Sequence, residues 1–132
     1  MKKMILETDY VEIIHDSDLN LGKIAWKRKT TLEEYQVAFI TMLNYSNENP
    51  IKYFLSDIRN QSVVSPESRK WFETEVIPKA IESGYSKAAV LFDGNVFKKH
   101  YINMLINVTN KFRVPLKMFN KEEDAIKWFA ES

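Results

Sequence analysis

The N-terminal part of the chain has the apolar pattern of extended backbone. Residues 4–6 and 10–14 are short apolar segments, and residues 22–27 form a strand in which Ile24 and Trp26 share one face. Lysines occupy the other face of that strand, so one side is predicted to be buried and the other solvated. These segments predict an antiparallel hairpin at the start of the fold.

Later strands have a different pattern. Residues 51–56 and 87–92 are short, nearly continuous apolar runs, and residues 115–119 form a final strand. Continuous apolar runs of this length are typical of strands that are covered on both faces. We therefore expect these strands to lie inside a sheet with helices packed on it.

Four stretches have helical apolar spacing, and each follows a residue that favours a helix start. The first helix follows Thr30 or Thr31, the second begins at Ser65-Pro66, the third near Asn95, and the last is capped by Asn120. The side chains predicted to be buried are, in chain order, Leu32, Tyr35, Phe39, Met42 and Leu43; Phe72, Val76 and Ala80; Phe97, Tyr101, Met104, Leu105, Val108 and Phe112; and Ala125, Ile126 and Phe129.

The element order is thus β-β-α-β-α-β-α-β-α, which predicts the α/β class. We expect a mixed sheet of about five strands, with an antiparallel N-terminal hairpin and the remaining strands parallel, and about four helices. Pro78 is predicted to kink or split the second helix. No linker-like composition interrupts the chain, so residues 1–132 are expected to form one domain.

Composition narrows the functional classes. The 132 residues include 19 basic and 18 acidic side chains, and a net charge of +1 provides no long-range attraction for nucleic acid. Cysteine is absent, and two histidines cannot form a histidine metal cluster, so we expect no metal ion and no cofactor. With neither a secretory signal nor a membrane-spanning apolar stretch, a cytoplasmic location is expected.

The whole chain resembles the STAS superfamily of anti-sigma-factor antagonists, in particular its SpoIIAA-like branch, which is related to the CRAL-TRIO lipid carriers. The features that carry the resemblance are Trp26 near the end of a short strand and three stretches: FLSDIRNQSVVSPESRKWF (54–72), VIPKAIESGYSKAAVLFD (76–93) and EEDAIKWF (122–129). The resemblance implies a STAS-like domain that is not an enzyme and that binds a protein partner or a second copy of itself.

In STAS antagonists, a partner kinase phosphorylates a serine in the loop after the third predicted strand. Here the corresponding stretch reads SVVSP (62–66), without the family's Asp-Ser pair and glycine. Ser65 is the nearest equivalent by placement, and Ser62 is the second. A phosphate on Ser65 would meet the N-terminus of a helix, and Arg59 or Arg69 would be available to pair with it.

Polar residues also follow the buried strands, at the edge where open α/β sheets bind ligands. Asp57, Arg59 and Asn60 follow the strand at 51–56, and Asp93 follows the next one. If the two aspartates met, they would suit acid/base chemistry or a magnesium ion, but no third ligand and no nucleophile accompanies them. Internal ion pairs and helix capping are the simpler interpretation.

Apolar residues outside the predicted buried stripes suggest a binding surface. Trp71 lies off the stripe of the second helix, and Ile102 and Ile106 lie off the stripe of the third. They either widen the core contact or form a surface for a partner.

Three functions remain in order of preference. The first is a non-enzymatic protein-interaction or regulatory module, switched at Ser65 or Ser62. The second is a carrier of a small apolar or lipid ligand, in which Trp26, Trp71, Phe97 and Tyr101 line a pocket, by analogy with the CRAL-TRIO relatives. The third is an enzyme that uses Asp57 and Asp93.

Overall fold

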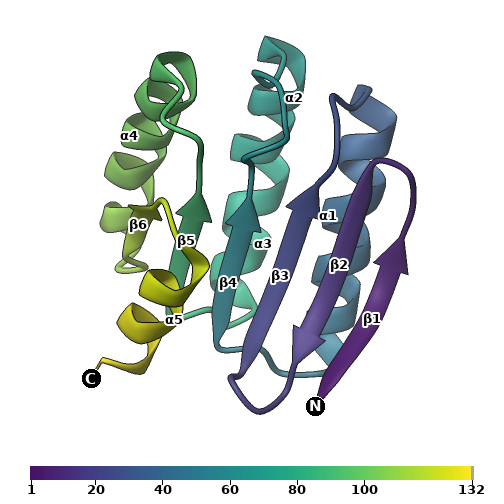
Figure 1. The fold of residues 1–132 in the computed structure, drawn as a ribbon, viewed down its shortest axis with the longest axis vertical. Helices are drawn as coiled ribbons and strands as arrows, with labels where there is room; N and C mark the ends of the chain where they lie inside the picture. The colour runs from purple at the N-terminus through teal and green to yellow at the C-terminus, as the bar shows by residue number, and fades with distance from the viewer. Residues whose placement is uncertain (132) are drawn as a thin grey trace.

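A six-stranded mixed sheet forms the centre of the fold, in a computed structural model that describes residues 1–131 (Figure 1). The strands are adjacent in the sheet in the same order as in the chain. They are β1 (Lys2–Glu7), β2 (Val11–Asp16), β3 (Leu21–Trp26), β4 (Tyr53–Asp57), β5 (Lys87–Leu91) and β6 (Leu116–Phe119).

The first three strands are antiparallel, so the predicted N-terminal hairpin is confirmed and extended by one strand. The segments predicted at residues 4–6 and 10–14 are two separate strands, β1 and β2, which is why the sheet has six strands instead of about five. Thr8 stabilises the turn between them, because its hydroxyl accepts hydrogen bonds from the amides of Tyr10 and Val11.

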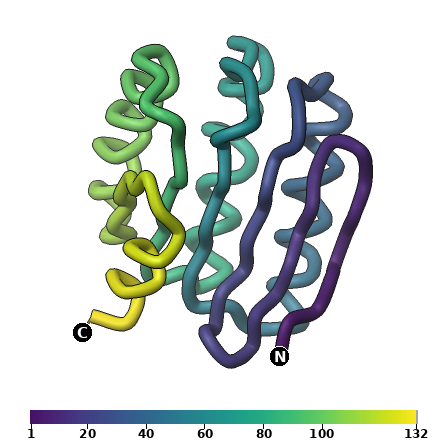
Figure 2. The backbone as a smooth tube through the Cα atoms, in the orientation of Figure 1, coloured from purple at the N-terminus to yellow at the C-terminus, as the bar shows by residue number. Residues whose placement is uncertain are grey.

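Strands β3 to β6 are parallel, as predicted, and helices connect each to the next. The connections are α1 (Leu32–Glu48), the continuous helical segment α2 (Pro66–Trp71), η1 (Phe72–Val76) and α3 (Ile77–Glu82), and then α4 (Val96–Lys111). These cover one face of the sheet, while α5 (Glu122–Ala130) covers the other (Figure 1). Both chain ends lie at the end of the sheet where β3, β4 and β5 begin (Figure 2).

Alternation along the strands produces two separate apolar cores. On the face of α1, the core contains Ile13, Ile24 and Trp26 together with aromatic side chains of the helix. On the face of α5, Leu55 and Leu91 pack against Ala125 and Phe129. Within β4 and within β5, consecutive residues therefore face different cores, on opposite sides of the sheet. The same alternation applies to the residues that directly follow each strand.

Three of the four predicted helix starts are confirmed. Thr31 forms a reciprocal capping box with Glu34, and Ser65 and Asn95 cap α2 and α4 through their side-chain oxygens. The prediction for the last helix was wrong. Its N-cap is Lys121, which makes no side-chain capping hydrogen bond; the negative charges of Glu122, Glu123 and Asp124 in the first turn suit the helix dipole instead.

The helical segment that contains Pro78 is interrupted, as predicted. A π-helical turn, η1, separates α2 from α3, and Pro78 occupies the first turn of α3. In a regular α-helix, proline lacks the amide donor for residue 74 and its ring meets the carbonyl of that residue. The wider turn, in which the amide of Ile77 donates to the carbonyl of Phe72, avoids this conflict.

Candidate functional site

An apolar cavity of about 160 Å³ lies between the sheet and the helices α2, η1, α3 and α4. Its floor is the helix-covered face of the last strands: Phe54 and Ser56 from β4, Ala88 and Val90 from β5. Its walls carry predominantly apolar side chains from both helical segments. A cavity of about 150 Å³ with such a lining is large enough for a benzene-sized molecule.

Helix α4 packs on β6, the last strand of the sheet. Its side chains Ile102 and Leu105 are buried and line the cavity, as do Ile77 and Ile81 of α3.

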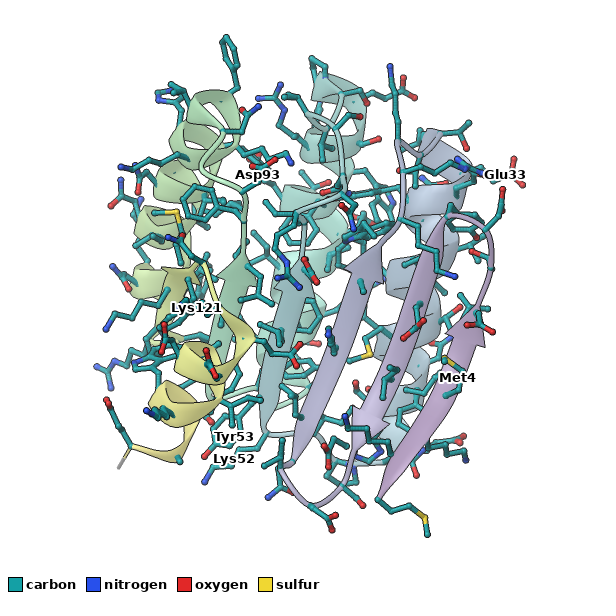
Figure 3. All side chains as sticks on the ribbon, viewed as in Figure 1. Met4, Glu33, Lys52, Tyr53, Asp93 and Lys121 are labelled. Atoms are coloured by element: carbon teal, nitrogen blue, oxygen red, sulfur yellow. The ribbon has the colours of Figure 1, made fainter. Side chains whose placement is uncertain are left out.

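The exposed members of the lining lie where β4 and β5 end. Ser62 and Val63 come from the loop after β4, and Phe97 comes from the first turn of α4. Phe97 is 73% exposed although it is a large apolar residue. We take this end, which Asp93 marks in Figure 3, as the entrance of the cavity, with Lys52 and Tyr53 at the opposite end of the sheet.

Tyr101 carries the main polar group of the cavity. Its hydroxyl is buried and, among residues 1–131, it is the one buried side-chain polar atom without a hydrogen-bond partner. Burial raises the pKa of Tyr101 well above its ordinary value, the charge of Glu73 raises it further, and Arg69 partly offsets both. The hydroxyl therefore stays protonated, and the surrounding side chains enclose it.

Tyr35 approaches the same region from α1. It lines the cavity, and burial followed by the neighbouring Tyr101 raises its pKa well above the ordinary value. Its ring is stacked on Trp26, with 5.2 Å between the ring centroids. This side chain thus belongs both to the packed aromatic cluster and to the cavity wall.

Two cations border the cavity. The guanidinium of Arg69 lies over the ring of Tyr101, 5.2 Å from its centroid, and its Nε donates to the carbonyl of Val64. Lys98 is buried, and its ammonium donates to the carbonyl of Ile58 at 2.9 Å and to Asp93 at 3.2 Å. Asp93 therefore balances the charge of Lys98 inside the protein. Arg69 borders the cavity and has the ring of Tyr101 as its partner.

A search of solved structures finds a protein with a similar fold. The crystal structure of an uncharacterised protein of the DUF3478 family from Shewanella loihica PV-4, described as having a SpoIIAA-like fold, aligns with a TM-score of 0.59 over 98% of this chain and 93% of that one. The fold is SpoIIAA-like. Sequence identity is 19%, so the likeness concerns the fold alone.

No family model and no curated protein matches the sequence. The SpoIIAA-like fold agrees with the resemblance read from the sequence. Within residues 1–131, no helix is long and apolar enough to cross a membrane, and no group of three or more metal-ligating side chains comes together.

The SpoIIAA-like fold separates the polar residues that the sequence placed at one rim. Ser56 faces the cavity, so Asp57, the next residue of β4, faces the α5 side of the sheet. Arg59 follows it there: its Nε and Nη2 bind the Asp57 carboxylate at 2.9 and 2.7 Å, and the charge of Glu122 of α5 also raises its pKa. Asn60 is exposed in the loop that follows.

Both aspartates remain ionised in their own ion pairs. Burial would raise the pKa of Asp57, but hydrogen bonds from the side chain and backbone of Arg59 outweigh it and hold the pKa below its ordinary value. The pKa of Asp93 is lowered by the amide of Asn95 and by Lys98. A general acid needs a raised pKa, so these shifts do not favour paired-carboxylate chemistry.

The two switch serines differ in their surroundings. Ser65 is exposed, and its hydroxyl accepts from the amide of Ser68 and donates to the Ser68 hydroxyl, so it acts as a helix cap. Ser62 lies at the entrance of the cavity.

The apolar candidates are mainly core residues. Trp71 is partly buried and meets Tyr35 edge-to-face, on the opposite side of the sheet from Arg59. Ile102 is 3% exposed and Ile106 is half-buried, so the wider core contact is the alternative that the structure supports for Ile102. The exposed apolar residues of α4 are Val96, Phe97, Met104 and Phe112, three of which were predicted to be buried.

Sequence reasoning identified part of the cavity. Trp26, Phe97 and Tyr101 line it, as the carrier hypothesis expected, whereas Trp71 does not. The importance of Arg69 beside Tyr101 was missed. The two residues are 32 positions apart on different helices, and no local pattern indicates that a guanidinium lies on a tyrosine ring.

Proposed function

We propose that this protein binds a small apolar molecule in the cavity between the sheet and the helices α3 and α4. The observation that carries the proposal is an apolar space of about 160 Å³ that no side chain of residues 1–131 fills. An unfilled apolar space costs stability, and a ligand that fills it restores the missing contacts.

The size of the cavity limits the ligand. Pockets for drug-sized molecules usually have volumes of about 300 to 1,000 Å³, about twice this cavity or more. A single ring or a short chain fits, and a two-chain lipid does not. The proposal thus narrows the carrier hypothesis to small ligands, and it involves binding without chemical conversion.

Toluene is a suitable probe because it is apolar and slightly larger than benzene. We expect toluene to raise the melting temperature of the wild-type protein, since a ligand that binds only the folded state stabilises it. Amide shifts in NMR spectra should locate the effect at α3, α4 and the strands below them. Native mass spectrometry of freshly purified protein would show whether a small molecule already occupies the site.

A cavity-filling variant provides the control. Ala88 lies on the cavity floor, and Ala88→Leu should abolish the response to toluene. Ala130→Leu makes the same change at an exposed position at the end of α5 and should leave the response intact. A wild-type protein that shows neither a thermal shift nor local amide shifts with toluene would contradict the proposal.

A second candidate is a protein-interaction module switched at Ser65. It is favoured by the exposure of Ser65 at the start of the helical segment and by the exposed side chains of Val96 and Phe97 on α4. Intact-mass measurement on protein from its native host would detect a phosphate, and light scattering would detect a second copy of the chain. Unmodified monomer under all growth and stress conditions would count against this candidate.

A further inference from the structure

The charged side chains that line the cavity are all positive. Arg69 and Lys98 line it, together with the hydroxyl-bearing Tyr35 and Tyr101, and within residues 1–131 no aspartate or glutamate belongs to the lining. The raised pKa values of the two tyrosines keep both as hydrogen-bond donors at neutral pH. The cavity therefore offers positive charge and donors, which suit a negatively charged acceptor.

Arg69 is the cation with remaining binding capacity. Its Nε is used by the carbonyl of Val64, but no carboxylate of residues 1–131 lies within ion-pair distance of its guanidinium. Arg59 and Lys98 differ in this respect, because Asp57 and Asp93 pair with them. A guanidinium without a carboxylate partner at the wall of an apolar cavity is available to a negatively charged ligand.

Glu73 is the acidic residue that affects this end of the cavity most. Its charge raises the pKa of both cavity tyrosines, while Arg69 lowers that of Tyr101. Glu73 is exposed and outside the lining, so water screens it more than it screens groups at the cavity wall. Both charges therefore act at the cavity wall, and Arg69 is the one of the two that belongs to the lining.

We infer that the ligand is a small apolar carboxylate. This inference rests on the proposed function, and it adds the chemical class of the ligand. The ring or chain fills the apolar space, and the carboxylate binds the free Nη atoms of Arg69. Planar guanidinium groups match carboxylates in geometry and charge, and stacking on Tyr101 holds this guanidinium in place.

Phenylacetate and 2-phenylacetamide form a matched pair of probes, because they share shape and differ in charge. Titration calorimetry or NMR titration at pH 7 should show phenylacetate binding about 10- to 100-fold more tightly, the range for a hydrogen bond to a charged group. Toluene serves as the neutral apolar reference. Equal or weaker binding of phenylacetate relative to the amide would overturn the inference.

Three variants assign the effect to its residues. Arg69→Gln should reduce phenylacetate affinity about tenfold or more and leave that for 2-phenylacetamide nearly unchanged. Tyr101→Phe keeps the ring under the guanidinium and should leave the preference for phenylacetate nearly unchanged. Lys70→Gln, which removes an exposed charge from the same helix outside the lining, should change neither affinity. Circular dichroism confirms that each variant is folded.

The outcomes separate the two proposals. If toluene binds but Arg69→Gln leaves the preference for phenylacetate intact, the inference is wrong and the proposed function stands. If neither toluene nor phenylacetate binds the wild-type protein, both are wrong. A loss of preference that is equal in Lys70→Gln and Arg69→Gln would indicate a general charge effect and would also overturn the inference.

Discussion

Two halves of the same helical layer differ in how completely they are packed. The packed half, under α1, contains the fully buried Ile24 and Ala38, which lie outside the cavity lining. An aromatic cluster, in which Phe39 lies 4.9 Å from Tyr35 and 5.0 Å from Phe72 between ring centroids, forms its border with the cavity. The cavity half, under α4, contains the open space and the unpaired hydroxyl of Tyr101. Both halves are built from apolar side chains, so the difference lies in how completely the space is filled and not in polarity.

This difference indicates in which half tight packing stabilises the fold and in which half there is space for a ligand. At fully buried positions of the packed half outside the cavity lining, such as Ile24 and Ala38, a lost methylene leaves a new void. In the cavity half, neighbours are already missing on one side. The following predictions compare the same type of change in the two halves.

Truncation of isoleucine should give the largest difference. Ile24 is fully buried in the packed half, and Ile102 is 3% exposed at the cavity wall. Ile24→Ala should cost about 4 kcal/mol of unfolding free energy and Ile102→Ala about 2, because large-to-small core changes cost about 2–5 depending on how tightly the removed atoms are packed. Urea denaturation measures both. Equal costs would mean that the cavity is filled in solution.

Enlargement of alanine should have opposite signs in the two halves. Ala38 is completely buried in the packed half, so Ala38→Leu should lower the unfolding free energy by about 1–3 kcal/mol through overcrowding. Ala88→Leu at the cavity floor should leave stability unchanged or raise it. Thermal unfolding of both variants tests this, and a destabilised Ala88→Leu would contradict the presence of usable space.

Removal of a tyrosine hydroxyl should separate a paired group from an unpaired one. Tyr85 is hydrogen-bonded to Ser46, so Tyr85→Phe should cost about 1 kcal/mol. Tyr101→Phe removes a buried hydroxyl without a partner, and it should raise stability by about 1 kcal/mol when no ligand is present. A destabilised Tyr101→Phe would show that the hydroxyl is bonded in solution, and the comparison would fail at that point.

The smallest effect concerns the two arginines that follow β4. Arg59 holds the pKa of Asp57 below 3.8, so this pair stabilises the fold at neutral pH, and the contribution disappears as the pH falls through the lowered pKa of Asp57. Arg59→Gln should therefore cost about 1 kcal/mol at pH 7, because Arg59 is partly exposed and screened, and the cost should shrink as the pH falls through the lowered pKa of Asp57. Arg69→Gln should change stability little over the same pH range. Denaturation measured across this range tests both expectations.

Much of the fold was predictable because it depends on local patterns. The continuous apolar runs of β4 and β5, the caps at Thr31, Ser65 and Asn95, and the α/β alternation each need only neighbouring residues to be read. Local patterns failed for α4, where Phe97, Met104 and Phe112 have helical spacing but are about half exposed or more. Spacing identifies a stripe, and the neighbours decide which part of it is buried.

The candidate site was predictable only in part. The sequence placed Asp57, Arg59 and Trp71 at one rim, because they lie close together in the chain. The pleat of β4 sends Asp57 and Arg59 to the α5 side, while Trp71 joins the aromatic cluster under α1. A one-residue step along a strand changes the face of the sheet, and the sequence does not show which face lies against which helix.

The sequence by itself determined the order of strands and helices, where three of the four predicted helices begin and the absence of cysteine chemistry, since periodicity, capping and composition are local properties. Only the tertiary structure decided that α4 packs on β6, that a cavity lies between the sheet and the helices, and that Arg69 lies on Tyr101 without an ion-pair partner among residues 1–131. Those features depend on distances between elements far apart in the chain, and such distances are set by packing of the whole sheet and its helices.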